Sequence, residues 1–236
     1  MEFCLKALGQ DDALEGAAKA GFDKAEIGLL NAQRSLSRGG SLGSILSSFR
    51  DAGLSPAVQI PLSLPYGFGG GMGSAEGPDP EDLLALAGII CTNGGASLVI
   101  VDPFVIGPDF PLMPEGMIRD DVRLSLLRLI AGHPYLRPCL RPSGAEGSSV
   151  KTLSEAAAVL ESLNRHEAGL CCDLSLLGDG AADDLRTLPQ GMVRALRLCS
   201  DPSLNRAALK ALEGSRMLVC ASLGEAAALR AAGGIS

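Results

Sequence analysis

Short apolar segments and longer amphipathic segments alternate along the whole chain. The short segments are nearly continuous runs of Leu, Val, Ile, Ala and Cys, which are typical of strands buried on both faces. The longer segments are rich in Ala and Leu at helical spacing, which favours helices that bury one face. The short segments predict eight strands, over residues 2–7, 24–29, 57–62, 97–102, 137–141, 169–173, 193–199 and 216–221.

A helix is expected after each strand, and several of these helices carry their own end signals. Thr152 followed by Glu155 forms a capping box at a helix start. Gly21, Gly53 and Gly214 each follow an amphipathic stretch, where glycine favours the left-handed conformation that ends a helix. The other expected helices cover residues 11–20, 42–52, 81–93, 119–131, 183–188, 203–212 and 225–232.

Strict alternation of strand and helix implies parallel strands. Eight units over 236 residues favour a closed (β/α)8 TIM barrel that spans residues 1–236 as a single domain. An open doubly wound sheet is the alternative. The turn after its first strand often carries GxGxxG, whereas this chain has Leu8-Gly9-Gln10-Asp11 at that place.

Composition narrows the classes of partner and the cellular compartment. A net charge of −7 argues against nucleic acid as the main partner, because such proteins usually present a basic patch. No apolar run reaches about 18 residues, so no membrane span is expected. The N-terminal residues lack the pattern of a signal peptide. Seven Cys without a CxxC pair suggest buried, reduced thiols and a cytoplasmic protein, which exposed apolar helix faces could make a homodimer.

The active site of a TIM barrel lies at the carboxyl ends of its strands. The polar residues at these predicted ends are Lys6, Glu26, Tyr66, Asp102, Arg141, Asp173, Asp201 and Ser222. Glu26, Asp102 and Asp173 are the candidate proton-transfer residues, since carboxyl groups in different environments can act as acid and base. The other five are candidate substrate-binding residues. His133 and His166 fall before strands, at the opposite end, and are not expected to be catalytic.

Two of these features have alternative interpretations. Arg141 could bind an anionic ligand through its guanidinium group, or form an internal salt bridge with Asp173 on the neighbouring strand. The glycine-rich segment 66–74 could be a lid over the barrel mouth or a surface loop.

Four motifs, in order along the chain, resemble those of the xylose isomerase-like family, which includes sugar phosphate isomerases and epimerases and endonuclease IV. Each motif is weak alone, but their order and spacing are moderately specific. They are Ala18-Lys19-Ala20-Gly21-Phe22-Asp23-Lys24-Ala25-Glu26-Ile27, Lys151-Thr152-Leu153-Ser154-Glu155-Ala156, Gly169-Leu170-Cys171-Cys172-Asp173 and Leu196-Arg197-Leu198-Cys199-Ser200-Asp201.

The resemblance implies a TIM barrel and a divalent metal bound by Glu, Asp and His at the strand ends, but most of those positions differ here. Arg141 stands in place of the Glu of strand 5, Leu176 and Leu198 stand in place of two His, and strand 8 offers no carboxylate. Asp173 alone is retained, so no metal or other cofactor is expected. A divalent ion held through Asp173 is the alternative.

The resemblance therefore implies a protein that acts on or binds a small polar, anionic, sugar-type metabolite without the family's metal. If it is active, it would be an isomerase or epimerase. The alternative is a catalytically inactive barrel that serves as a binding or interaction module. A repair nuclease is disfavoured by the acidic charge.

Overall fold

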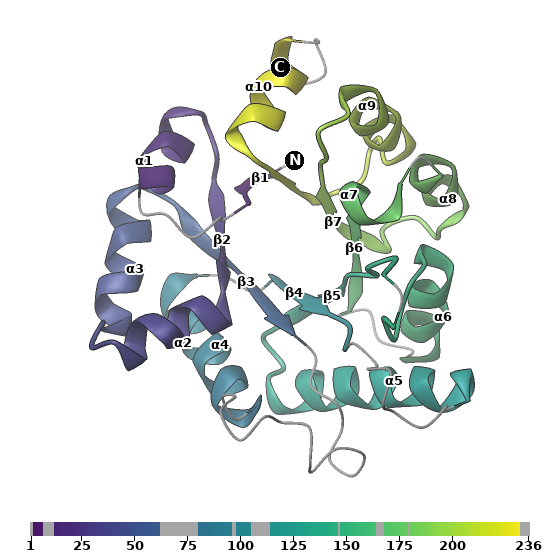
Figure 1. The fold of residues 1–236 in the computed structure, drawn as a ribbon, viewed down its shortest axis with the longest axis horizontal. Helices are drawn as coiled ribbons and strands as arrows, with labels where there is room; N and C mark the ends of the chain where they lie inside the picture. Colours follow the sequence, from purple (N-terminus) through teal and green to yellow (C-terminus); the bar gives the residue numbers. More distant parts are fainter. Residues whose placement is uncertain are drawn as a thin grey trace.

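Eight parallel strands close into a barrel that helices surround (Figure 1). The computed structural model describes residues 2–6, 12–61, 80–95, 98–104, 114–145, 147–163, 168–178 and 180–231. Each strand pairs with the next one along the chain. β8 (Leu218–Ala221) completes the ring by pairing with β1 (Glu2–Leu5), with Cys220 opposite Cys4. The predicted closed (β/α)8 barrel is therefore confirmed.

The predicted strands are all present, and their ends agree with the prediction to within two residues. The remaining six strands are β2 (Lys24–Gly28), β3 (Ser55–Pro61), β4 (Leu98–Asp102), β5 (Arg137–Leu140), β6 (Gly169–Asp173) and β7 (Val193–Arg197).

The structure adds two helices that the sequence pattern did not predict. α2 (Leu29–Ser37) directly follows β2, and α7 (Leu174–Leu177) is a single turn directly after β6. Both begin where a strand ends with no intervening loop, so no change of periodicity separates them from the strand. The other helices are α1 (Asp12–Lys19), α3 (Leu42–Asp51), α4 (Pro80–Gly94), α5 (Glu115–Gly132), α6 (Leu153–Leu163), α8 (Ala181–Thr187), α9 (Pro202–Ala211) and α10 (Leu223–Ala231).

The predicted helix ends are formed as expected. Thr152 accepts a hydrogen bond from the backbone N–H of Glu155 at 3.1 Å, and the Glu155 carboxylate accepts one from Thr152 N–H at 3.3 Å. Gly21 and Gly53 have φ of 75° and 71°, the left-handed region that glycine enters without a steric cost. Within the described residues, no helix is long and apolar enough to cross a membrane.

The apolar residues form two layers. A large outer layer lies between the strands and the helices. A smaller inner layer fills the barrel and contains Cys4, Ala57, Ile100, Cys139, Cys171, Ala195, Leu218 and Cys220. All seven Cys of the chain are buried and free, which agrees with the prediction of thiols that pack as small hydrophobic groups.

β7 contains an irregularity that changes which residues face the barrel interior. Leu170 lies opposite Val193, whereas Cys171 lies opposite Ala195, so Arg194 is an extra residue in β7. A bulge of this kind reverses the alternation of the residues that follow it. Val193 and Leu198 consequently both pack in the outer layer, although strict alternation would place them on opposite faces.

Buried thiols should make the fold sensitive to alkaline pH. Burial raises the pKa of Cys91 to about 11 and of Cys139 and Cys172 to about 12, from an ordinary value of 9.0. The folded state therefore retains protons that the unfolded chain loses, so this contribution to stability is complete below pH 9 and is lost as pH rises toward 12. We expect the free energy of unfolding in urea to fall between pH 8 and pH 10.5, and to fall less in Cys139→Ala/Cys172→Ala. An equal fall in both proteins would contradict this role for the thiols.

Candidate functional site

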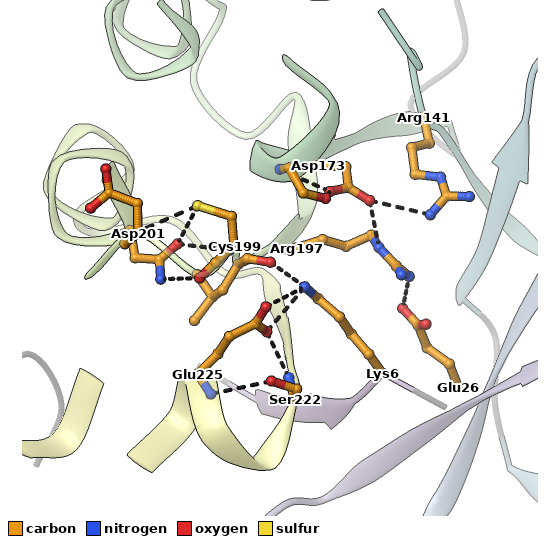
Figure 2. A network of polar contacts seen from close by, with 12 residues as sticks. Lys6, Glu26, Arg141, Asp173, Arg197, Cys199, Asp201, Ser222 and Glu225 are labelled. Atoms are coloured by element: carbon orange, nitrogen blue, oxygen red, sulfur yellow. Dashed lines mark hydrogen bonds and ion pairs between the residues drawn. The ribbon is translucent and has the colours of Figure 1, made fainter. Parts of the chain in front are cut away.

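A continuous chain of charged side chains crosses the barrel at the carboxyl ends of the strands. Glu26, Asp102 and Asp173 come from β2, β4 and β6, Arg197 ends β7, and Arg141 directly follows β5. Figure 2 shows Arg197 between Asp173 and Glu26, with Arg141 on the other side of Asp173. The structure thus brings all three predicted proton-transfer residues into one network, which we call the mouth network and which also includes Gln59 of β3.

Arg197 is the central cation of the mouth network. Its Nε donates a hydrogen bond to Oδ2 of Asp173 at 2.8 Å, and its Nη1 donates one to Oε1 of Glu26. The three side chains are 12%, 4% and 3% exposed. Burial alone would lower the pKa of Arg197, but nearby acidic groups, Glu26 above all, raise it above its ordinary value. Arg197 is therefore a permanent buried cation.

Arg141 is held by two carboxylates. Its Nε and Nη2 both lie 2.6 Å from Oδ1 of Asp102, and its Nη1 lies 3.3 Å from Oδ2 of Asp173. Oδ2 of Asp102 accepts a further hydrogen bond from Nε2 of Gln59 at 2.7 Å. The internal salt bridge between Arg141 and Asp173 is thus present, and the positive charge of Arg141 is already compensated by protein groups.

Asp173 is the residue on which the mouth network converges. Its Oδ2 accepts from both arginines, and its Oδ1 accepts from the backbone N–H and the hydroxyl of Ser175 at 3.2 and 2.5 Å. The same carboxylate therefore caps α7 and neutralises two guanidinium groups. Asp102 is the most accessible of the three carboxylates, with 23% of its side chain exposed, whereas Asp173 has 4%.

Lys6 and Ser222 form a second polar group beside the mouth network. Nζ of Lys6 lies 3.0 Å from Oε2 of Glu225 and donates a hydrogen bond to the carbonyl of Leu198. The hydroxyl of Ser222 accepts from Glu225 N–H at 3.2 Å, and the Glu225 carboxylate accepts from Ser222 N–H at 2.7 Å. Ser222 is thus the first residue of a capping box for α10, and Lys6 is held by Glu225 (Figure 2).

The remaining predicted residues lie elsewhere. Asp201 is exposed and caps α9, since its Oδ1 accepts from Ser203 N–H at 2.7 Å. His133 ends α5 before β5, away from the barrel mouth, as predicted. Tyr66, the glycine-rich segment 66–74 and His166 lie outside the described residues.

The donor set at the mouth does not fit a divalent metal ion. Divalent cations need several free oxygen or nitrogen donors. Here the carboxylates are cross-linked by two guanidinium groups, and no group of three or more His, Cys, Asp or Glu among the described residues could hold a metal. Leu176 is part of α7, and Leu198 packs outside the barrel in the outer layer.

Three residues of the site were missed at the sequence level: Arg197, Gln59 and Glu225. Gln59 lies two residues after the interior residue Ala57, so alternation along β3 could have identified it. Arg197 could not be identified this way, because the bulge at Arg194 reverses the alternation. Ser222 and Glu225 have the spacing of a capping box, which would have assigned both.

Comparison with known proteins supports the fold. No family model matches the chain, and no curated protein sequence matches it. Three solved structures illustrate the likeness. The IolI protein with a bound zinc atom is 18% identical, with a TM-score of 0.72 over 98% of this chain and 91% of that one.

Two further solved structures have the same fold as this chain. D-allulose 3-epimerase from Methylomonas sp., in complex with D-allulose, is 18% identical, with a TM-score of 0.69 over 94% of this chain and 83% of that one. A fusion of a xylose isomerase-like TIM barrel with 4-hydroxyphenylpyruvate dioxygenase is 19% identical, with a TM-score of 0.64 over 94% of this chain and 38% of that one. The chain thus has the fold of the xylose isomerase-like TIM barrels. The resemblance of its sequence motifs predicted this fold.

Removal of the Arg197 guanidinium should strongly destabilise the protein. Arg197→Met leaves Glu26 and Asp173 buried next to one fewer cation, and breaking a buried ion pair costs about 3–5 kcal/mol. Urea unfolding of the variant and the wild type measures this cost. Arg186→Met is the matched control, because Arg186 forms an exposed ion pair with Asp183 and should cost less than about 1 kcal/mol. Similar costs for the two variants would contradict a central role for Arg197.

Proposed function

We propose that the protein is an isomerase- or epimerase-type barrel that binds a small polar, sugar-type metabolite at the mouth network and acts on it without a divalent metal. The observation that carries this proposal is the meeting of Glu26, Asp102 and Asp173 around two guanidinium groups at the strand ends. Catalytic residues of TIM barrels come from these strand ends. The fold shared with a D-allulose 3-epimerase supports the same class of substrate.

The chemistry follows from the groups present. Isomerisation or epimerisation next to a carbonyl removes a proton from carbon and returns it, with negative charge developing on the carbonyl oxygen in between. Asp102 is the candidate base, because it is the most accessible carboxylate of the network. Arg141 is the candidate cation for the developing oxyanion, a role in which a fixed positive charge is effective in a site that excludes water.

The substrate need not be an anion. The expectation of an anionic metabolite depended on an uncompensated Arg141, and the structure pairs this residue with Asp102 and Asp173. Hydroxyl groups can donate to the carboxylates and accept from the guanidinium groups. A neutral polyhydroxylated molecule therefore matches the alternating charges of the mouth network.

A binding module without turnover is the second candidate. Every acidic residue of the network is engaged by Arg141, Arg197, Gln59 or Ser175, which limits the capacity of these carboxylates to accept a proton. The free, buried thiols support a reducing, cytoplasmic location for either function. Nucleic acid and membranes are not proposed as partners, and a homodimer remains our expectation.

The test of this function is proton exchange without metal. The protein is incubated in D₂O with EDTA and D-allulose, D-fructose or their phosphate esters, and NMR monitors deuterium incorporation at the carbon next to the carbonyl. We expect incorporation by the wild type and a loss of about 10²-fold or more in Asp102→Asn, because a general base contributes on this scale. Asp201→Asn is the matched control, since it removes the same charge from an exposed helix cap.

The other outcomes separate the alternatives. Saturable binding of a sugar without exchange would support the binding module. Exchange that requires added Mn²⁺ or Mg²⁺ would overturn the metal-free proposal, as would about one metal ion per chain in elemental mass spectrometry of protein purified without chelator. The absence of both binding and exchange would overturn the function itself.

A further inference from the structure

A cavity of about 480 Å³ lies at the amino ends of the strands, opposite the mouth network. Its lining comes from the first residues of several strands, among them Glu2 of β1, Lys24 of β2, Leu98 of β4 and Arg137 of β5. The inner layer of the barrel forms its apolar wall, through residues such as Leu218. The volume is in the range of small-molecule sites, about 300–1,000 Å³.

The polar part of the lining is strongly basic. Lys24, Arg137, Arg194 and Arg216 line the cavity, and Glu2 is the only acidic residue among the lining residues that the structure describes. Oε2 of Glu2 lies 3.5 Å from Nζ of Lys24. No carboxylate of the described residues forms an ion pair with Arg137 or Arg216. The chain as a whole has a net charge of −7, so this end carries a local excess of positive charge.

The position of Arg194 depends on two local features of the backbone. Arg194 is the extra residue of the bulge in β7, and a bulge re-aims the side chain that it carries. Its side chain then crosses β6 at Gly169: a Cβ at this glycine would lie 2.2 Å from Cγ of Arg194. The missing side chain at position 169 therefore provides the space through which a fourth cation reaches the cavity.

We propose that this cavity binds a small metabolite that carries two or more negative charges next to an apolar group. One guanidinium group can bind two oxygens of a phosphate or carboxylate at the same time. Three guanidinium groups line the cavity, each from a different strand end. The apolar wall receives the uncharged part of the ligand. The inner layer separates this cavity from the mouth network, so the proposal does not depend on the function proposed above.

Calorimetry of the full chain tests the proposal with three probes. ADP combines a diphosphate with a flat apolar ring, pyrophosphate has only the charge, and adenosine has only the ring. We expect ADP to bind with a stoichiometry of one, pyrophosphate to bind more weakly, and adenosine to give no detectable heat. Citrate in place of pyrophosphate distinguishes a polycarboxylate site from a phosphate site. No binding of ADP, pyrophosphate or citrate at millimolar concentration would overturn the proposal.

Variants locate the bound probe. Arg137→Gln/Arg216→Gln should weaken binding of the anion by about 100-fold or more, because each of the two lost charged hydrogen bonds contributes about tenfold or more. Arg50→Gln/Arg206→Gln is the matched control, since it removes two charges from exposed positions of α3 and α9. Equal weakening in both double variants would mean nonspecific attraction and would overturn the assignment, as would unchanged binding in Arg137→Gln/Arg216→Gln.

A third variant keeps all the charges. Gly169→Ala should displace Arg194 and weaken binding, while thermal unfolding verifies that the variant is folded. Asp102→Asn should leave anion binding unchanged, because Asp102 lies at the other end of the barrel. Weaker binding of the anion by Asp102→Asn would mean that the probe binds at the mouth network, and this result would overturn the proposal.

Discussion

The buried ion pairs of Arg197 are the interaction on which the barrel mouth depends. One guanidinium group joins Glu26 of β2 to Asp173 of β6, and Asp173 in turn holds Arg141 and the first turn of α7. Taking these charges out of water is expensive, and buried ion pairs often stabilise a fold no more than apolar side chains of the same volume would. The ion pairs of the network therefore serve mainly to fix the relative positions of its side chains, rather than to stabilise the fold. In the observed arrangement every charged member has a partner of opposite charge.

This arrangement determines what the mouth can accept. Two cations and three anions alternate across the strand ends, so a ligand that brings a strong charge of either sign must displace a protein group from its partner. A ligand with many hydroxyl groups can join the alternating pattern, because each hydroxyl both donates and accepts. The ligand that we propose, a polar molecule without charge, is compatible with this alternation of charges.

Much of the barrel was predictable, because apolar runs and helix-ending glycines mark its units directly. Glu26, Asp102, Arg141 and Asp173 were identified because they stand at the carboxyl ends of these apolar runs. Asp201 and Ser222 were predicted to bind substrate, and the structure shows both as helix caps. A residue that follows a strand and precedes a helix is often a cap, and caps use the same polar residue types as binding sites. Lys6 was assigned to substrate, whereas its partner Glu225 lies at the far end of the sequence, where no local pattern connects the two.

Arg197 illustrates a limit of another kind. One extra residue at Arg194 decides whether Arg197 or Leu198 faces the interior, and nothing in the hydrophobic pattern of β7 marks this insertion. The register is set by pairing with β6, which only the three-dimensional structure defines.

The thiol-rich inner layer has a further consequence for the molecule as a whole. Cys4, Cys139, Cys171 and Cys220 are almost fully inaccessible to water, and with Ile100 and Leu218 they fill the barrel between its two charged ends. Among the residues that the structure describes, this buried layer separates the two ends of the barrel. The eight strands connect the two ends, and their close-packed interior resists deformation. The two ends of the barrel are therefore separate surfaces that are built on the same eight strands.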